Sequence, residues 1–231
     1  MQTTTQTKTK PPVVEPPPEF RAGEIMSMDS PQLVEILKNP ASTEFQRAKA
    51  CQRLAVVGNK DAVPALAAML GDPKLAHYAR FGLAPIPDPA ADDALRAAAG
   101  KLKGILLVGV INTIGHRRDV KAVPMLTRML NGTDIELARA AAASLGQISG
   151  PSATKALRDA LVRTKGAVRT AAAEAGLVSA EGLMAQGDRK GALALYDVLS
   201  RPDMPKPVRL AAMHSTIEAE TSLRRTRPAV K

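Results

Sequence analysis

The stretch "IGHRRDVKAVPML" at residues 114–126 places two large aliphatic residues, Ile114 and Leu126, twelve positions apart. The same interval separates four further pairs of leucines: Leu54 and Leu66, Leu83 and Leu95, Leu145 and Leu157, Leu183 and Leu195. Successive pairs start 29, 31, 31 and 38 residues apart. Self-similarity at a period near 30 residues is typical of repeat architectures. We therefore predict five equivalent units.

Each unit is predicted to be a helix, a short turn and a second helix. In four units another leucine follows the pair by four positions, which puts both on one helix face; these are Leu70, Leu130, Leu161 and Leu199, with Ala99 in the second unit. Seven positions before the second leucine stands a residue type that caps helix N-termini: Asn59, Asp88, Asp119, Gly150 and Asp188. We expect Gly71, Gly100 and Gly132 to end the second helices in left-handed backbone.

A single hairpin of this kind cannot bury its own apolar face, whereas stacked copies can, so the units predict a solenoid. They resemble the HEAT-repeat family in its short, phycobilisome-lyase-type form. The resemblance rests on "DAVPALAAML" (61–70), "DVKAVPMLTRML" (119–130) and "AAAASLGQISGPSATKALRDAL" (140–161), and it covers roughly residues 41–199. It implies an all-α fold, an α-solenoid of five to six stacked hairpins as in bacterial HEAT-repeat proteins, and a binding surface more often than an active site.

The chain is expected to divide into three regions. Residues 1–25, with "KPPVVEPPPEF", hold few apolar anchors and predict a disordered or polyproline tail. The solenoid is expected over 26–224, with Asp29 or Ser30 capping its first helix, and a basic tail over 225–231. The segment "GILLVGVIN" is rich in strand-forming residues, but its place in the repeat predicts a helix. Seven extra residues in the fifth unit predict a first helix, near 166–186, that is two turns longer.

Composition narrows the class of protein. The net charge is +10, and Cys51 is the single cysteine, which excludes an internal disulfide. The longest apolar run, residues 104–111, is too short to span a bilayer, and no stretch resembles a signal peptide. We expect no membrane association and a cytoplasmic location, or an exported protein whose signal has been removed.

Two basic surfaces are predicted. With the leucines pointing inward, the residues one or two positions later point outward, and we expect a partner-binding row there made of Arg96, Arg128, Arg158 and Tyr196. Arginine and tyrosine are favoured as interface anchors. The turns within the hairpins predict a basic edge made of Lys60, Arg117, Arg118, Arg189 and Lys190. For each of these charges, a merely solvated side chain is the alternative.

The stretch "LAHYARFGLAPIPDPAADDAL" (75–95) gathers His77, Tyr78 and Phe81 opposite the packed stripe of its helix. An exposed aromatic cluster of this kind would dock a partner; alternatively, the preceding hairpin or the N-terminal tail covers it. The three aspartates that follow in this stretch have structural explanations, as a helix cap and as favourable charges in a first helical turn.

The function predicted is a non-enzymatic protein-interaction scaffold whose partner is another protein, an acidic one fitting the basic row. Nucleic-acid binding by a basic concave face is the alternative, and a lyase or other enzyme of the HEAT-like class is the second. We expect no cofactor and no metal site, because the sequence holds no Walker loop, GxSxG or CxxC motif. His77, His116 and His214 also lack the following glutamate of HEAT-type hydroxylases. The sequence leaves the oligomeric state open.

Overall fold

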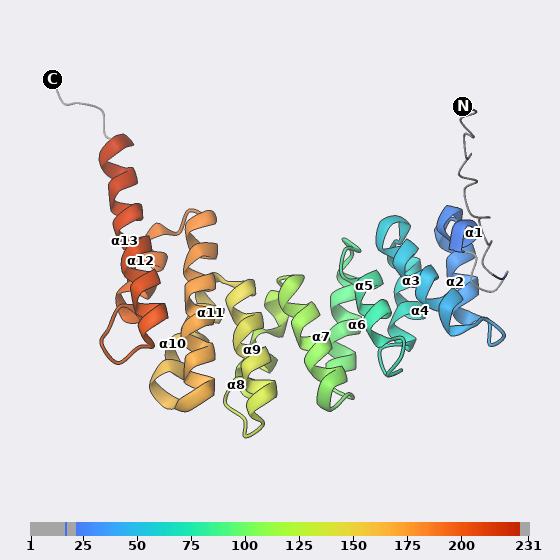
Figure 1. Cartoon of the computed structure of the whole chain (residues 1–231), viewed down its shortest axis with the longest axis horizontal. Helices are drawn as coiled ribbons and strands as arrows, with labels where there is room; N and C mark the ends of the chain where they lie inside the picture. The colour runs from blue at the N-terminus through green and yellow to red at the C-terminus, as the bar shows by residue number, and fades with distance from the viewer. Residues whose placement is uncertain (1–16, 18–21, 227–231) are drawn as a thin grey trace, which may run out of the picture.

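The structure is a computed structural model that describes residue 17 and residues 22–226, without the side chains of residue 220 and residues 222–226. Within this part, every regular element is a helix, which confirms the all-α prediction. Helical hairpins stand side by side in one bowed row, and the first and last described helices lie at its two ends (Figure 1). The predicted tails, except residues 17, 22–25 and 225–226, lie outside the described residues.

The repeat consists of alternating first and second helices. The first helices are α3(Glu44–Val57), α5(Ala76–Leu83), α7(Gly104–His116), α9(Ile135–Ile148) and α11(Gly166–Ala185). The second helices are α4(Val63–Ala68), α6(Pro89–Ala99), α8(Val123–Leu130), α10(Gly150–Arg163) and α12(Arg189–Leu199), with 3₁₀ turns η2(Lys60–Ala62) and η3(Val120–Ala122) leading into two of them. Helices α1(Ala22–Ser27) and α2(Ser30–Lys38) precede the array, and α13(Lys206–Thr226) follows it.

The ten residues of the five twelve-residue pairs form the centre of the core. None of them is more than 2% exposed. Burying a leucine or isoleucine side chain stabilises a protein by about 1.5–3 kcal/mol relative to leaving it exposed. The predicted repeat is therefore confirmed, and its apolar residues are the ones that hold neighbouring hairpins together.

The predicted caps are mostly confirmed. Asn59, Asp88, Asp119 and Asp188 each accept a backbone N–H at the start of a second helix or its 3₁₀ turn. Gly150 was expected in this role, and that is wrong: it is the first residue of α10, and Ser149 is the N-cap. Asp29 caps α2 in a capping box with Gln32, as expected of this position.

The left-handed glycines were predicted on the wrong helices. Gly100 has φ −74°, and neither Gly71 nor Gly132 has a positive φ. Left-handed residues instead end two first helices, at Arg118 after α7 and at Gly187 after α11. The N–H of the residue that follows each one donates to a carbonyl five residues earlier: Asp119 to Ile114, and Asp188 to Leu183. This is the Schellman geometry, which the chain needs where it reverses sharply within a hairpin.

Two further predictions concern the length of the fifth unit and the end of the N-terminal tail. Helix α11 has 20 residues against 14 in α9, which confirms the extended fifth unit, and it rises above α9 in Figure 1. The tail was predicted to reach residue 25, but α1 begins at Ala22, so that boundary is wrong. Ile25 is only 5% exposed and α1 packs on α3, so Ile25 is an apolar anchor that orders this segment.

The first helices approach one another closely. A Cβ atom on Gly115 of α7 would lie 2.6 Å from Ser144 Cα of α9, and one on Gly146 of α9 would lie 2.7 Å from the Ala175 carbonyl oxygen of α11. No larger residue fits at either position without moving a helix. Helices α7, α9 and α11 thus form one close-packed layer. The side chains that project from this layer determine the shape of its surface.

Candidate functional site

Two adjoining cavities lie over three consecutive first helices. One has a volume of about 400 Å³ and the other about 480 Å³, and both are lined by Gln147 and Val178. We call the two together the first-helix groove. Its lining comes from α7, α9 and α11 and from the turns that follow α7 and α9: Val108, Asn112, His116, Arg118, Glu136, Arg139, Ala140, Ala143, Ser149, Ala171, Glu174, Ala175, Glu181, Gly182 and Ala185.

Small side chains make the groove. Ala140 and Ala143 of α9, with Ala171 and Ala175 of α11, line it where the two helices meet. Val178 is 44% exposed and stands between the two cavities. An apolar surface of this kind, bordered by polar side chains, is the usual anatomy of the centre of a protein–protein interface.

Some charged side chains of the groove have ion-pair partners and others have none among the described residues. Arg139 pairs with Glu136 at 3.1 Å, both on α9. Glu174 and Glu181 on α11 are exposed, and neither forms an ion pair within the described part of the chain. They are seven residues apart, about 10.5 Å along the helix, with Val178 between them. The α11 side of the groove therefore offers two free carboxylates on either side of an apolar residue.

One end of the groove is built by strained backbone. Arg118 and Ser149 are the described non-glycine residues with positive φ, at 56° and 57°, and both line this end. Each stands four residues after the first aliphatic residue of its pair, the register position that Gly187 occupies in the fifth unit. Ser149 Oγ donates to the carbonyl of Gly146 at 2.8 Å and contacts Gly182, where a side chain would clash. The tight turns thus place an exposed side chain, Arg118, and a buried one, Ser149, at this end of the groove.

The predicted basic row is only partly present. Arg128 and Arg158 are exposed and form no ion pair with any described residue. Arg96 was expected to point outward as well, but it bridges Asp93 and Asp119 and its side chain is 20% exposed. Asp119 caps the 3₁₀ turn before the second helix of the next unit, so a contact between units engages this arginine.

Tyr196 was also predicted to point outward, and this is wrong. It is 3% exposed, because α13 packs on α12 and covers it. Burial raises the pKa of the Tyr196 hydroxyl, although a hydrogen bond with Ser215 of α13 opposes the shift. Tyr196 therefore stabilises the end of the array and is not an interface anchor.

The predicted basic edge contains one buried member. The Arg117 side chain is 7% exposed and donates to the carbonyls of Leu83, Ala84 and Ile86 at 3.0, 2.9 and 2.7 Å. It also forms a two-point ion pair with Asp92. Its placement on an open edge was wrong, because the end of α5 in the preceding unit surrounds it.

The rest of the edge is mixed. Arg189 is half-buried and donates to the Ala219 carbonyl of α13. Lys60, Arg118 and Lys190 are exposed, as predicted, and Arg118 reaches the first-helix groove.

The aromatic cluster lies on the same face as the groove. Phe81 is 53% exposed, His77 is exposed, and the half-buried Tyr78 packs edge-on against His77 at 5.6 Å between ring centres. Phe81 is in register with Asn112 and Ala143, each 31 residues further along, and both line the groove. Among the described residues, no hairpin covers Phe81. The tail that was the other candidate cover lies largely outside them.

The carboxylates of the proline-rich turn are structural. Asp88 caps α6, Asp92 pairs with Arg117, and Asp93 pairs with Arg96. In the described part of the chain, no three or more His, Cys, Asp and Glu side chains are grouped so that they could hold a metal ion. Nor does that part include a helix with the length and apolar character needed to cross a bilayer.

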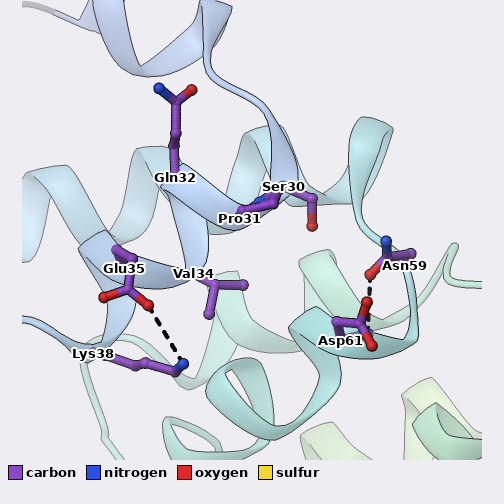
Figure 2. A pocket seen from close by; sticks show the side chains of 8 residues that line it. All are labelled: Ser30, Pro31, Gln32, Val34, Glu35, Lys38, Asn59 and Asp61. Atoms are coloured by element: carbon purple, nitrogen blue, oxygen red, sulfur yellow. Dashed lines mark hydrogen bonds and ion pairs between the residues drawn. The ribbon is translucent and has the colours of Figure 1, made fainter.

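A further cavity of about 410 Å³ lies between α2 and η2, lined by Ser30, Pro31, Gln32, Val34, Glu35, Lys38, Asn59 and Asp61 (Figure 2). Its polar groups bond one another. Lys38 reaches Glu35 at 3.5 Å, and the Asn59 side chain accepts the Asp61 N–H at 2.9 Å. Capping bonds at Gln32 and Asn59 and the ion pair within α2 account for these polar groups, so the first-helix groove is the stronger candidate.

Sequence reasoning missed the groove, although a signal was available. The outward positions of the first helices carry small residues in α7 and α9, whereas α5 carries aromatic ones there. The alanines of neighbouring helices form one hollow only because the helices lie close together. The repeat period in the sequence does not specify that distance.

Comparison with known proteins finds a repeat family that matches the middle of the array. HEAT repeats match residues 104–177, the segment from α7 into α11. Two engineered proteins solved by a structural genomics consortium are each 21% identical over 83% of this chain, with TM-scores of 0.45 and 0.47; the alignments cover 96% and 58% of those proteins. No curated protein matches the sequence.

Proposed function

Because residues 104–177 match HEAT repeats, we propose that the protein is a non-enzymatic interaction scaffold that binds a helical segment of a partner protein in the first-helix groove. One observation carries the proposal: three consecutive first helices line two adjoining cavities, with alanines and Val178 at the centre, polar side chains around them, and two carboxylates that form no ion pair with a described residue. Helix-in-groove recognition uses such a surface, with apolar anchors spaced three or four residues apart.

The chemistry of the partner segment follows from that of the groove. Bulky apolar side chains fit over the four alanines, and lysine or arginine side chains two helical turns apart would reach Glu174 and Glu181. The exposed Phe81 and His77 extend the surface by one unit toward the N-terminus.

The first test is capture of partners by matched variants. Ala143→Glu, on the exposed face of α9 within the groove, is expected to abolish capture of a specific partner, because a charge enters the apolar centre of the interface. The control is Val162→Glu on α10, outside the groove at 87% exposure. Identical partners for the wild type and Ala143→Glu, or equal losses in both variants, would contradict the proposal.

A second candidate function is nucleic-acid binding by the second helices. Arg128 of α8 and Arg158 of α10 are exposed and unpaired within the described residues, and Arg163 extends this surface. The same row would serve an acidic protein partner. Phosphate contacts make affinity fall steeply with salt, so an Arg128→Glu/Arg158→Glu variant should lose retention on a DNA or heparin column. No retention of the wild type at about 50 mM salt would exclude nucleic acid.

A further inference from the structure

We infer that the guanidinium of Arg80 receives a carboxylate side chain of the partner segment, one unit to the N-terminal side of the groove. The inference rests on the proposed function, because this carboxylate belongs to the same helical segment that occupies the groove. Arg80 lies on α5, which packs against α7 in the row of first helices (Figure 1).

Arg80 stands at a core position of the repeat. It precedes the first leucine of its pair by three residues, and in the other four units this position holds a fully buried apolar residue: Cys51, Ile111, Ala142 and Ala180. Arg80 is half-buried, as expected when a long side chain carries its charged end out of the core. Departures from a consistent local pattern concentrate at functional or strained sites. This position therefore calls for a reason other than packing.

The charge of Arg80 is not compensated within the described part of the chain. No described carboxylate forms an ion pair with it. Its Nη1 donates to the Gly109 carbonyl at 3.0 Å, its Nε is buried without an acceptor, and its Nη2 is accessible and forms no hydrogen bond to a described residue. Burial lowers the pKa of this guanidinium. A partly desolvated cation without a counter-charge costs free energy, which a bound carboxylate would offset.

The neighbouring helix makes room for the guanidinium. A Cβ atom on Gly109 of α7 would lie 2.5 Å from Arg80 Cζ, so the guanidinium lies directly on the α7 backbone. Gly109 is in register with Ala140, and Phe81 is in register with Asn112; Ala140 and Asn112 both line the groove. The Arg80 guanidinium and the exposed Phe81 ring thus belong to the continuation of the groove surface onto α5.

A carboxylate is the group that fits this arrangement. Nη2 and the second hydrogen of Nη1 form a fork that matches the two oxygens of a carboxylate. At the other end of the surface, Glu174 and Glu181 require basic residues. Close-packed helices are about 8–10 Å apart, so about 20–25 Å separates Arg80 from α11, which a helix spans in about 13–17 residues. The partner segment is therefore expected to be acidic at its α5 end and basic at its α11 end.

The test uses a small carboxylate as a probe of Arg80 alone. The full chain, labelled with ¹⁵N, is titrated with 3-phenylpropionate, whose phenyl ring can contact Phe81, and separately with the neutral 3-phenylpropionamide. The backbone amide signal of Gly109 reports binding in every variant, because this residue lies under the guanidinium. The carboxylate is expected to shift the signal in a saturable manner, and the amide to bind at least about tenfold more weakly.

Two variants separate recognition from folding. Arg80→Met keeps an unbranched apolar side chain at a core position and should lose at least about tenfold in carboxylate affinity while its melting temperature stays the same or rises. Arg80→Lys keeps the charge without the fork and should bind with intermediate affinity. The matched control is Arg117→Met, which removes an arginine that the array itself uses and should lower the melting temperature by several degrees.

Three outcomes would overturn the inference: equal shifts with the carboxylate and the amide, unchanged carboxylate affinity in Arg80→Met, or a fall in melting temperature as large in Arg80→Met as in Arg117→Met. Any of these, together with an Ala143→Glu variant that still abolishes partner capture, would leave the proposed function intact. Carboxylate binding as expected, with partner capture unaffected by Ala143→Glu, would instead contradict the groove and retain Arg80 as the anion-binding residue.

Discussion

At the scale of single residues, neighbours in the sequence have opposite roles. Arg117 and Arg118 follow each other at the end of α7, yet the first is buried among backbone carbonyls of the preceding unit and the second is exposed at the groove. Arg117 satisfies carbonyls at the end of α5, which have no helical partner of their own. Its planar fork lets one side chain serve several acceptors at once.

Arg117→Lys should therefore be destabilising. Lysine cannot reach the carbonyls and Asp92 together, so buried acceptors lose their donors, at a cost of about 2–4 kcal/mol in the free energy of unfolding. Urea denaturation followed by circular dichroism measures this. Arg118→Lys is the adjacent control, expected to change stability by less than about 0.5 kcal/mol. Equal effects of the two substitutions would contradict the role assigned to Arg117.

Cys51 provides a second residue-scale prediction. It is fully buried in α3, and burial raises the pKa of its thiol to about 12 from 9.0. Because the thiolate is the reactive form, the native protein at pH 8 should react with a disulfide reagent orders of magnitude more slowly than the urea-unfolded chain.

The pH dependence of stability has a definite sign. The folded state holds the Cys51 proton more tightly, so this contribution is complete below pH 9 and is lost as the pH rises from about 9 to 12. In the Cys51→Ala variant, the free energy of unfolding should therefore fall less between pH 9 and 12 than in the wild type, as measured by urea denaturation at each pH. For the reactivity prediction, a native Cys51 thiol that reacts as fast as the thiol of the unfolded chain would contradict its burial.

At the scale of elements, the ends of the first helices are the informative feature. In α7 and α11 the chain reverses through a left-handed residue, which is Arg118 in one unit and Gly187 in the other, with φ of 56° and 85°. A side chain in this region costs about 1–2 kcal/mol through contact of Cβ with the backbone. The array tolerates the cost at Arg118, at the rim of the groove.

Reciprocal substitutions test this. Arg118→Gly should raise the free energy of unfolding by about 0.5–1 kcal/mol, and Gly187→Ala should lower it by about 1 kcal/mol. Thermal and urea unfolding measure both. If Arg118→Gly were destabilising, the side chain would have to make contacts that exceed the backbone strain.

At the scale of the whole molecule, stacking turns local patterns into surfaces. Close approach of α7, α9 and α11 makes the outward alanines one groove, and the same stacking consumes Arg96, Arg117 and Tyr196 in contacts between units. The candidate surfaces lie on opposite kinds of helix: the groove on the first helices, and Arg128 with Arg158 on the second. The groove and the exposed arginine pair thus lie on faces that no single hairpin has.

The sequence by itself determined the hairpins, their register, most caps and the extra length of α11. Each of these depends on residues within one unit, and five repetitions of the twelve-residue interval made the pattern unambiguous. Tertiary structure decided which charges are free and where a hollow forms. The partners of Arg117 lie 25–34 residues away, in the preceding unit, and the groove needs side chains from three units. Such contacts depend on the distance between stacked helices, which close packing sets and which periodicity does not encode.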